Sequence, residues 1–439
     1  MLLLVSSCQL VTRKVYRNAM APASRPPIAL PVMLRALRHR NYRLLFFGQL
    51  ISLCGVWMQI TAQGWLILRL TNSPLWLGLI AAAQSLPVLL LSLHAGALAD
   101  KAPKRTLLMI TQSVAMISAL ALALLLFSGQ IQVWHVLVAA LLGGIVAAVD
   151  NTARQAFTIE LVGREDLMNA IALDSMVFNG SRIIGPATAG ALVAVIGEAP
   201  AFLFNGLSFL AVIIGLLMMR LQPFQAPTQQ SGSGHLREGI AYIMGEPKVR
   251  LLLLQIGLLC VFGLAYVPLL PSFARDVLGG DALVFGLVAS TNAAGALCAA
   301  LVIALFGDRI PRGKYLTIAL LSYSLLLCGF TLQRELLPAL LLIAAVGWAG
   351  ITSLTISNTL LQAMVPDALR GRVMSVFVLM VMGVSQLSGL MLAAIADLIG
   401  DVALTVGVWT MLGWCVLLGV RFAHTRVLRD PTVAVQERR

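Results

Sequence analysis

The sequence repeats itself after about half its length, and this repeat limits the folds that the chain can adopt. Three pairs of segments carry it, namely GALADKAPKR (96–105) with LFGDRIPRGK (305–314), DNTARQAF (150–157) with SNTLLQAM (357–364), and NYRLLFF (41–47) with KVRLLLL (248–254). In the first pair Asp100 matches Asp308 and Pro103 matches Pro311, an offset of 208, and in the other two pairs the offset is 207. A constant offset at three separated places indicates two structural repeats that follow each other in the chain.

The hydrophobic residues of the chain form twelve long runs. Of the 439 residues, 59% are hydrophobic and 11% are charged, whereas soluble domains carry about 25% charged residues. The runs are 44–70, 75–99, 106–128, 132–154, 168–196, 199–220, 251–274, 282–306, 315–332, 336–363, 373–396 and 402–420. A spanning helix needs about 20 apolar residues, and the fully apolar runs are too long for barrel strands. The sequence therefore predicts an all-α membrane protein with 12 transmembrane helices, in two pseudo-symmetric six-helix bundles.

The domain organisation follows from the repeat and from the composition between the runs. The stretch LQPFQAPTQQSGSG is rich in Pro, Gln, Ser and Gly, which is typical of a linker. The basic segment MLRALRHRNYR before the first run is amphipathic, so we expect it to lie along the inner membrane surface. The predicted units are a leader and interfacial helix (1–43), a bundle (44–220), a cytoplasmic linker with an amphipathic helix (221–248), a second bundle (249–421) and a cytoplasmic tail (422–439).

The positive charge of the chain is placed on one side of the predicted membrane. The net charge is +13, and all but four of the 31 Lys and Arg residues lie in the tails and in alternate loops. This distribution follows the positive-inside rule and predicts a multi-pass protein of the cell inner membrane with both termini in the cytoplasm. The charge therefore reports topology and contact with membrane lipid, and it argues against a nucleic-acid partner.

Sequence signatures of cofactor and metal sites are missing. The chain has no G-x-x-x-x-G-K-[ST] segment, because its one Gly-Lys pair is followed by Tyr315. The six cysteines form no C-x-x-C pair, and no nucleophile or paired-carboxylate arrangement stands out. We expect no cofactor, no metal and no enzyme activity. Any uphill transport would then depend on an ion gradient or on another subunit.

Two matched loops carry a carboxylate and basic residues at the predicted inner face. A carboxylate there can accept hydrogen bonds from the backbone N–H groups at the start of a neighbouring helix. We interpret the pair of loops as a latch between the two halves, although such charges can also simply anchor topology. The predicted latch residues are Gly96, Asp100, Lys104 and Arg105 in the first loop and Asp308, Arg309 and Arg312 in the second, and Asp150 and Arg154 at the inner end of the fourth run are counted with them.

These motifs resemble a known family. GALADKAPKR is similar to the loop signature of the major facilitator superfamily, and LFGDRIPRGK to its weaker second copy. SRIIGPATAG (181–190) resembles the glycine-proline motif of the fifth helix in its antiporters, with Ala189 where that motif has a glycine. AVDNTARQAFTIELVGREDLMNAIAL (148–173) is similar to the exporter branch with enterobactin exporters and macrolide efflux proteins. The resemblance implies two bundles, alternating access and a single-chain transporter.

Charged residues inside the predicted spans need an explanation, because each costs several kcal/mol there, about 3 on insertion scales. Asp150 and Arg154 are four residues apart and are expected to pair along one helix. Asp174 and Arg182 share a helical face, with Asn179 beside it. One interpretation is a salt-bridge network that locks the first half, which we favour for Asp150 and Arg154. The other is a proton or substrate relay, which we favour for Asp174 and Arg182.

Uncharged polar residues outline a possible substrate path. Candidates are Gln59 and Gln63 in the first run, Asn292 in the eighth and Gln386 in the eleventh. Each can equally serve to join helices through hydrogen bonds. In the fifth run, we expect Gly185, Pro186 and Gly190 to allow bending and close packing.

Taken together, these features predict a secondary active transporter of a small molecule. We expect export of bulky hydrophobic compounds such as a drug, macrolide or siderophore, with proton coupling as a hypothesis and a monomer as the working unit. The alternatives are an importer or a lysophospholipid flippase of the same fold. Outside transport, a polytopic membrane sensor or enzyme stays open.

Overall fold

The computed structural model describes residues 34–221, 236–307 and 312–429. Within these ranges the regular structure is helical throughout. The helices of the first half are η1 (Arg35–Arg38), α3 (Arg40–Thr71), α4 (Pro74–Lys101), α5 (Lys104–Phe127), α6 (Val133–Ile196) and α7 (Ala199–Met218). Those of the second half are α8 (Leu236–Gly245), α9 (Pro247–Leu258), η2 (Leu259–Gly263), η3 (Leu264–Leu269), α10 (Leu270–Ser272), η4 (Phe273–Val277), α11 (Ala282–Phe306), α12 (Arg312–Thr331), α13 (Leu336–Met364), α14 (Asp367–Leu379), η5 (Met380–Val384), α15 (Ser385–Ile399) and α16 (Val402–Arg429).

Twelve membrane spans result from these helices. In the described ranges, 11 continuous helical stretches are long and apolar enough to cross a membrane. The longest of them, α6, has 64 residues and is two spans that meet at Gly163, where φ is 70° and ψ is 177°. This backbone conformation is essentially restricted to glycine. The loop expected between runs four and five therefore reduces to a single residue, because the chain on both sides of Gly163 stays helical.

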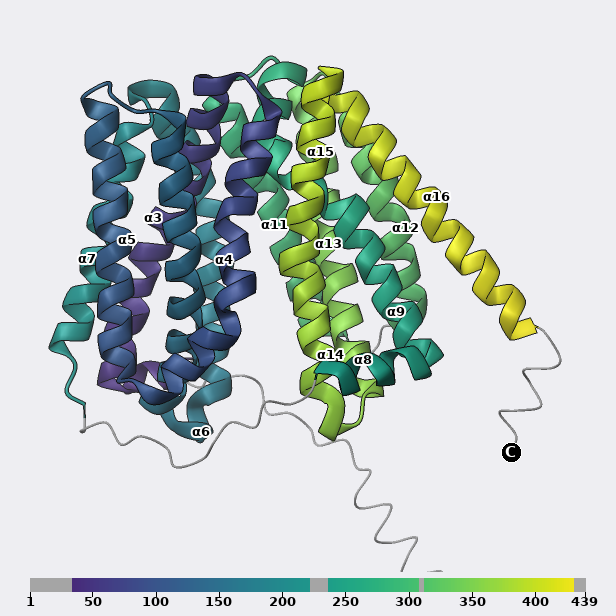
Figure 1. Ribbon diagram of the computed structural model, residues 1–439, viewed down its shortest axis with the longest axis horizontal. Coiled ribbons are helices and arrows are strands. Elements are labelled where there is room, and N and C mark those ends of the chain that lie inside the picture. The colour runs from purple at the N-terminus through teal and green to yellow at the C-terminus, as the bar shows by residue number, and fades with distance from the viewer. Residues whose placement is uncertain (1–33, 222–235, 308–311, 430–439) are drawn as a thin grey trace, which may run out of the picture.

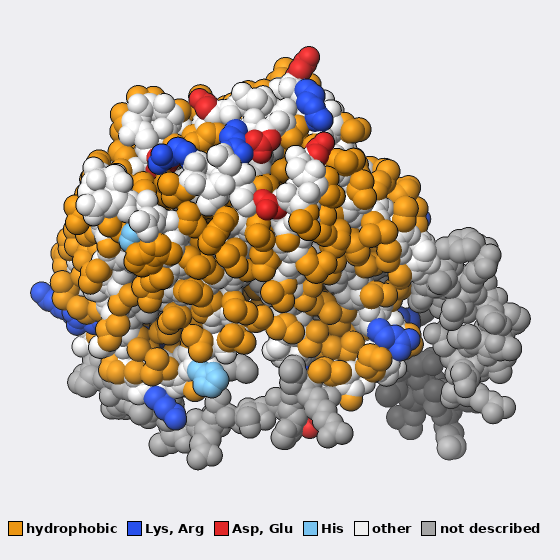
Figure 2. Space-filling model, turned by 45° about the horizontal axis from the view of Figure 1, so that its top comes forward, with side chains coloured by type: hydrophobic (Ala, Val, Ile, Leu, Met, Phe, Trp, Pro, Cys, Tyr) orange, Lys and Arg blue, Asp and Glu red, His pale blue; other side chains and the backbone are white. Residues whose placement is uncertain are grey.

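The spans are grouped into two lobes (Figure 1). Each lobe has six spans, because α6 supplies two of those in the first. The first lobe holds α3 to α7, and the second holds α9 to α16. Buried apolar clusters fill both lobes, and apolar side chains cover the sides of the molecule, whereas charged ones lie mainly toward its two ends (Figure 2). These findings confirm the predicted fold class, since a chain surrounded by lipid exposes apolar surface on its flanks.

The lobes pack against each other at the end opposite to α8. There the Ser73 hydroxyl donates to Asp397 Oδ1 at 2.6 Å, between α4 and α15. Further along, α6 packs on α11, where Gly190 and Gly286 bring the two backbones together. Toward the other end, where α3 begins, Met168 and Leu305 are 76% and 75% exposed. The lobes are thus closed at one end and separated at the end predicted to face the cytoplasm.

The second lobe has irregular helices at its centre. Its first span changes from α9 to the π segment η2 and then to the 3-10 segment η3, which contains Pro268. Such breaks free backbone carbonyl groups that need other donors. The carbonyl of Val261 accepts hydrogen bonds from the hydroxyl of Ser388 and from the indole of Trp409. Side chains of neighbouring helices therefore supply hydrogen bonds to this span where its own helical backbone hydrogen bonds are interrupted.

Two segment boundaries differ from the expected ones. In place of an interfacial helix within 33–43, the chain forms η1 and then enters α3 at Arg40, because His39 is extended and its side chain binds Asp166. At the other end, α16 continues to Arg429 instead of ending at 421. The linker helix expected after the break is present as α8, while the rest of the linker (222–235) lies outside the described residues.

Candidate functional site

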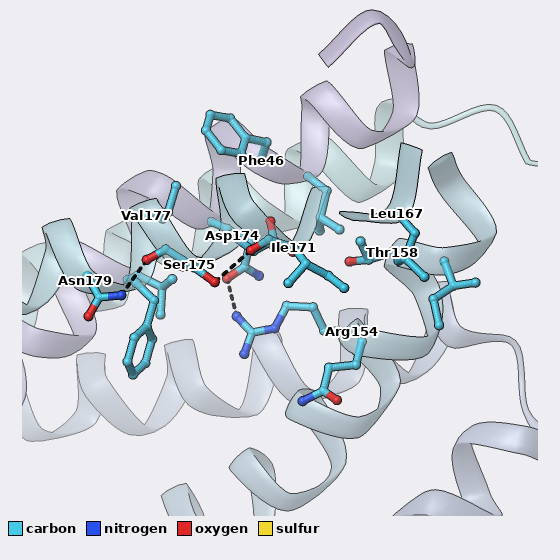
Figure 3. A pocket seen from close by; sticks show the side chains of 15 residues that line it. Phe46, Arg154, Thr158, Leu167, Ile171, Asp174, Ser175, Val177 and Asn179 are labelled. Atoms are coloured by element: carbon cyan, nitrogen blue, oxygen red, sulfur yellow. Dashed lines mark hydrogen bonds between the residues drawn. The ribbon is translucent and has the colours of Figure 1, made fainter. Parts of the chain in front are cut away.

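A cavity of about 470 Å³ lies in the first lobe, between α3 and the two parts of α6 (Figure 3). Its rim is accessible, since Ile159, Ile171 and Phe178 are 45–47% exposed. Most of the wall is apolar, and the polar groups in it are Gln49, Arg154, Gln155, Thr158, Asp174, Ser175 and Asn179. Such a site suits a largely apolar molecule that carries a few polar groups.

Asp174 is the carboxylate of this cavity. It lies in α6 after Gly163, and the hydroxyl of Tyr42 in α3 donates to its Oδ1 at 2.8 Å. Arg154, in α6 before Gly163, also lines the cavity and attracts the carboxylate electrostatically. A membrane-embedded carboxylate with a hydroxyl and a cation beside it is the arrangement expected of an ion or substrate site.

Arg154 connects the cavity to the interior of the lobe. Its Nη1 donates to Gln49 Oε1 at 2.7 Å, and its Nη2 donates to Asn151 Oδ1 at 2.6 Å. The predicted pair with Asp150 is present, with 3.8 Å between Arg154 Nε and Asp150 Oδ2. Because Arg presents five donors in a rigid plane, one guanidinium can bind all of these groups at once.

Asp150 is held mainly by the neighbouring helix α5. Its Oδ1 accepts from the hydroxyl of Thr111 at 2.9 Å and from Nε2 of Gln112 at 2.8 Å. The residue is 7% exposed. A buried carboxylate with three such partners joins α5 to α6, which is the structural role we favoured for it.

A second cavity of about 310 Å³ lies inside the same lobe and shares Gln49 and Arg154 with the first. The predicted path residues Gln59 and Gln63 line it. Gln59 also joins two helices, because its Oε1 accepts from Asn205 of α7 at 2.6 Å. For Gln59, lining a cavity and joining helices are therefore combined in one side chain.

Arg182 does not meet Asp174. Among the described residues, no hydrogen bond or ion pair joins them, and Arg182 instead lies over the ring of Trp57, 5.5 Å from its centroid. The two residues are eight positions apart on one helix, which separates them by about 12 Å along its axis. Asn179 lines the first cavity, and its amide donates to the carbonyl of Ser175 in the same helix.

Two predicted path residues of the second lobe lie away from both cavities. The Asn292 amide donates to the Tyr266 hydroxyl at 3.1 Å and to the Ile343 carbonyl at 3.3 Å, so it joins helices. Gln386 lies at the start of α15 and is half-buried.

The predicted latch is described only in part. The side chain of Asp100 and all of Asp308 and Arg309 lie outside the described residues. Lys104 pairs with Glu160 at 2.7 Å, and Arg105 donates to the carbonyl of Leu217 at 3.1 Å, both within the first lobe. Gly96 has open space where a Cβ would stand, and Arg312 is exposed at the start of α12. The latch remains a prediction.

The glycines of the fifth run allow close packing. A Cβ on Gly185 would lie 2.5 Å from Cβ of Trp57, and one on Gly190 would lie 2.7 Å from the carbonyl oxygen of Ala282. Pro186 lies between them inside α6. The second contact reaches the other lobe, so this part of α6 forms the seam between the lobes.

Sequence reasoning missed two features of this region. One is Tyr42, which stands in the weakest of the three repeats. The other is Asp166, which is 2% exposed and binds Arg35, Arg38 and His39, each at 2.8 Å. The buried Asp166 follows the Gly163 bend, and its neighbours Arg164 and Glu165 gave no signal of its distant basic partners. In 34–221, 236–307 and 312–429, no three His, Cys, Asp or Glu side chains gather as metal ligands would.

Comparison with known proteins identifies the family. The family model described as "Transmembrane secretion effector" matches residues 32–432, which is nearly the whole chain. The chain belongs to the major facilitator superfamily. It is therefore a multi-pass membrane transporter of small molecules, as the motifs predicted.

Its relatives include named exporters. The chain is 26% identical over 361 residues to the staphyloferrin A transporter of Staphylococcus aureus (strain NCTC 8325 / PS 47), covering 82% of this chain and 90% of that protein. It is 27% identical over 370 residues to the multidrug efflux pump Tap of Mycolicibacterium fortuitum, covering 81% and 89%. It is 25% identical over 338 residues to the enterobactin exporter EntS of Escherichia coli O1:K1 / APEC, covering 76% and 80%.

Solved structures show the same fold. One is a bacterial homologue of the human lysosomal transporter Spinster in an inward-facing, unoccupied conformation. The TM-score is 0.65 at 15% sequence identity, with 89% of this chain and 96% of that chain covered.

Proposed function

We propose that this protein is a proton-driven exporter of bulky, largely hydrophobic compounds, such as a drug, macrolide or siderophore. It lies in the inner membrane as a monomer with both termini in the cytoplasm, and works by alternating access. The end where the lobes are separated then faces the cytoplasm, so the structure corresponds to the state that loads substrate.

The observation that carries this proposal is the position of Asp174. Its carboxylate stands in the wall of a mostly apolar cavity with an accessible rim, beside Arg154 and the Tyr42 hydroxyl. A carboxylate in a membrane span is costly unless it is used or paired. In this site it can take up a proton in one conformation and release it in the other.

The substrate class is supported by the lining of the cavity and by the relatives. The apolar wall provides surface for a bulky compound, while Arg154 offers positive charge to polar or anionic groups on it. Two of the relatives carry names of siderophore transporters and one that of a drug pump. These names favour export, which separates this proposal from import or lipid flipping in the same fold.

Closure of the inner end would use the latch. In the outward-open state, we expect Asp100 and Asp308 to hold neighbouring helices, together with the basic residues beside them. In the present structure the closed end is the opposite one, held by contacts such as Ser73 with Asp397.

The test is transport into everted membrane vesicles with an imposed pH gradient. The probes are ethidium, a 14-membered macrolide and a citrate-type siderophore, chosen first by susceptibility profiling of a deletion strain. We expect Asp174→Asn to abolish gradient-driven accumulation while the protein remains folded. The matched control is Asp367→Asn, because Asp367 is an exposed residue of α14 and such surface carboxylates contribute little. Full gradient-driven accumulation by Asp174→Asn would contradict the proposal.

A further inference from the structure

The hydroxyl of Tyr42 has two acceptors within reach. It lies 2.8 Å from Oδ1 of Asp174 and 3.1 Å from the carbonyl oxygen of Ala170, one turn earlier in the same helix. A phenol carries one hydrogen and two acceptor lone pairs. The hydroxyl can therefore donate to only one of these oxygens at a time. Rotation about its C–O bond would turn the hydrogen from one acceptor to the other.

We propose that Tyr42 is a positioning residue that lets Asp174 both hold and release a proton. When Asp174 is ionised, the hydroxyl of Tyr42 donates to Oδ1. When Asp174 is protonated, its own O–H donates to the Tyr42 oxygen, and the Tyr42 hydrogen turns to the carbonyl of Ala170. This inference rests on the proposed function, in which Asp174 carries the proton.

The proton balance of this switch is simple. On release, the Asp174 proton passes to water in the cavity at the cytoplasmic side, and on loading it comes from water on the other side. Tyr42 keeps its own proton throughout, and only its O–H bond rotates. The Ala170 carbonyl also accepts the backbone N–H four residues later in α6, so its second lone pair receives the hydroxyl.

A tyrosine suits both protonation states of a carboxyl group away from bulk water. An ionised carboxylate there needs a donor, and a protonated one needs an acceptor for its hydrogen. A phenol supplies both without a change of charge. Arg154 supplies only donors and keeps its charge, so it favours the ionised form alone. Among the described partners of Asp174, Tyr42 is thus a group that can satisfy the protonated form.

The position of Tyr42 is fixed relative to Asp174. Tyr42 is fully buried, and the turn of the chain just before it is fastened to the same part of α6. The Ala36 backbone N–H donates to Asn169 Oδ1 at 2.8 Å, and His39 Nε2 lies 2.8 Å from Asp166 Oδ2. The chain before α3 and the segment of α6 after Gly163 are therefore joined next to the switch.

Few other charged groups face Asp174. The helix α3 carries Arg40 and Arg43 close to Tyr42 in the sequence, and both are exposed. The helix α11, which packs on α6 further along, contains no Asp, Glu, Lys, Arg or His in Ala282–Phe306. The remaining groups around it are Arg154 on α6 before the bend, Arg182 two turns later on its own helix, and Asp166 two turns earlier with its partners Arg35, Arg38 and His39. The arginines are charged at all working pH values, so the titration measured below is followed at the Asp174 carboxyl group itself.

The experiment is an infrared titration of the purified protein in lipid, which needs no transported compound. The band of the protonated Asp174 carboxyl is identified as the difference between the native protein and Asp174→Asn. Tyr42→Phe keeps the buried ring and removes only the hydroxyl. We expect it to raise the midpoint of the Asp174 titration by about one pH unit or more, since the lost hydrogen bond stabilised the ionised form. The C=O stretch of the protonated form should also move to higher frequency.

The matched control is Tyr323→Phe in the other lobe. The Tyr323 hydroxyl is likewise buried and donates to a backbone carbonyl, that of Gly263, at 3.0 Å. We expect the wild-type midpoint in this variant. An unchanged midpoint in Tyr42→Phe, an equal shift in Tyr323→Phe, or no Asp174 band in the native protein would overturn the switch. Gradient-driven export by Asp174→Asn vesicles would instead refute the proposed function and leave this result standing.

Discussion

The two lobes share one arrangement of helices but differ in what fills them. At matched positions 207 residues apart, Asp150 and Arg154 of the first lobe correspond to Ser357 and Leu361 of the second. Leu361 is fully buried, and Ser357 is 1% exposed. Where the first lobe has a polar, hollow centre, the second has close packing.

The same contrast holds at the start of each lobe. Tyr42 and Gln49 of α3 correspond to Val249 and Ile256 of α9, which are 0% and 1% exposed. The duplicated backbone thus places both sets of side chains in equivalent positions, but only one set can bind ions or polar groups. We infer that the first lobe carries the chemistry of transport, while the second acts as the packed body against which it moves.

The largest expected effect, on the yield of folded protein, comes from introducing the counterpart of Asp150 into the second lobe. Ser357→Asp would bury a carboxylate without the Arg, Thr and Gln partners that Asp150 has, at a cost of about 3–5 kcal/mol. We expect little folded protein, measured as the yield of monodisperse protein in detergent. Ser357→Ala is the control, since the Ser357 hydroxyl has no hydrogen-bond partner and its removal should be neutral. A stable Ser357→Asp variant would break the comparison.

A smaller effect is expected at the seam between the lobes. A Cβ on Gly286 would lie 2.4 Å from the carbonyl oxygen of Pro186, and overpacking of this kind costs about 1–3 kcal/mol. Gly286→Ala should therefore disfavour closure of the outer end and increase the accessibility of cysteines introduced there. Gly371→Ala in α14, where no atom lies within 4 Å of the added Cβ, should leave accessibility unchanged. Equal accessibility in both variants would show that the seam does not control closure.

The smallest expected effect concerns Arg182. Its guanidinium lies over Trp57, a contact worth about 0.5–1 kcal/mol at partly exposed sites. Trp57→Leu should raise the KM for a transported compound about two- to fivefold, with kcat nearly unchanged. Trp409→Leu in the second lobe should lower thermal stability without changing KM, because Trp409 bonds the backbone of Val261. A raised KM in Trp409→Leu together with an unchanged KM in Trp57→Leu would show that the second lobe, and not the first, contacts the transported compound.

The sequence alone determined the membrane fold, its two halves and the family, because these depend on hydropathy and on repeats along the chain. It also placed Asp150 next to Arg154, since a separation of four residues on a helix fixes proximity. It did not predict which residues of distant segments pair with each other. It also suggested that Asp174 and Arg182 could pair because they share a helical face, but they are too far apart along the helix axis to meet.

What tertiary structure decided is which side chains of different helices come together. The partner of Asp174 is Tyr42, which lies 132 residues away, and the partners of Asp166 are the basic residues before α3. No periodicity along the chain encodes such pairs, because they depend on how α3 packs against α6 and on the bend at Gly163. Local spacing therefore predicts contacts within a helix, whereas the contacts that make the site arise only when the helices are assembled.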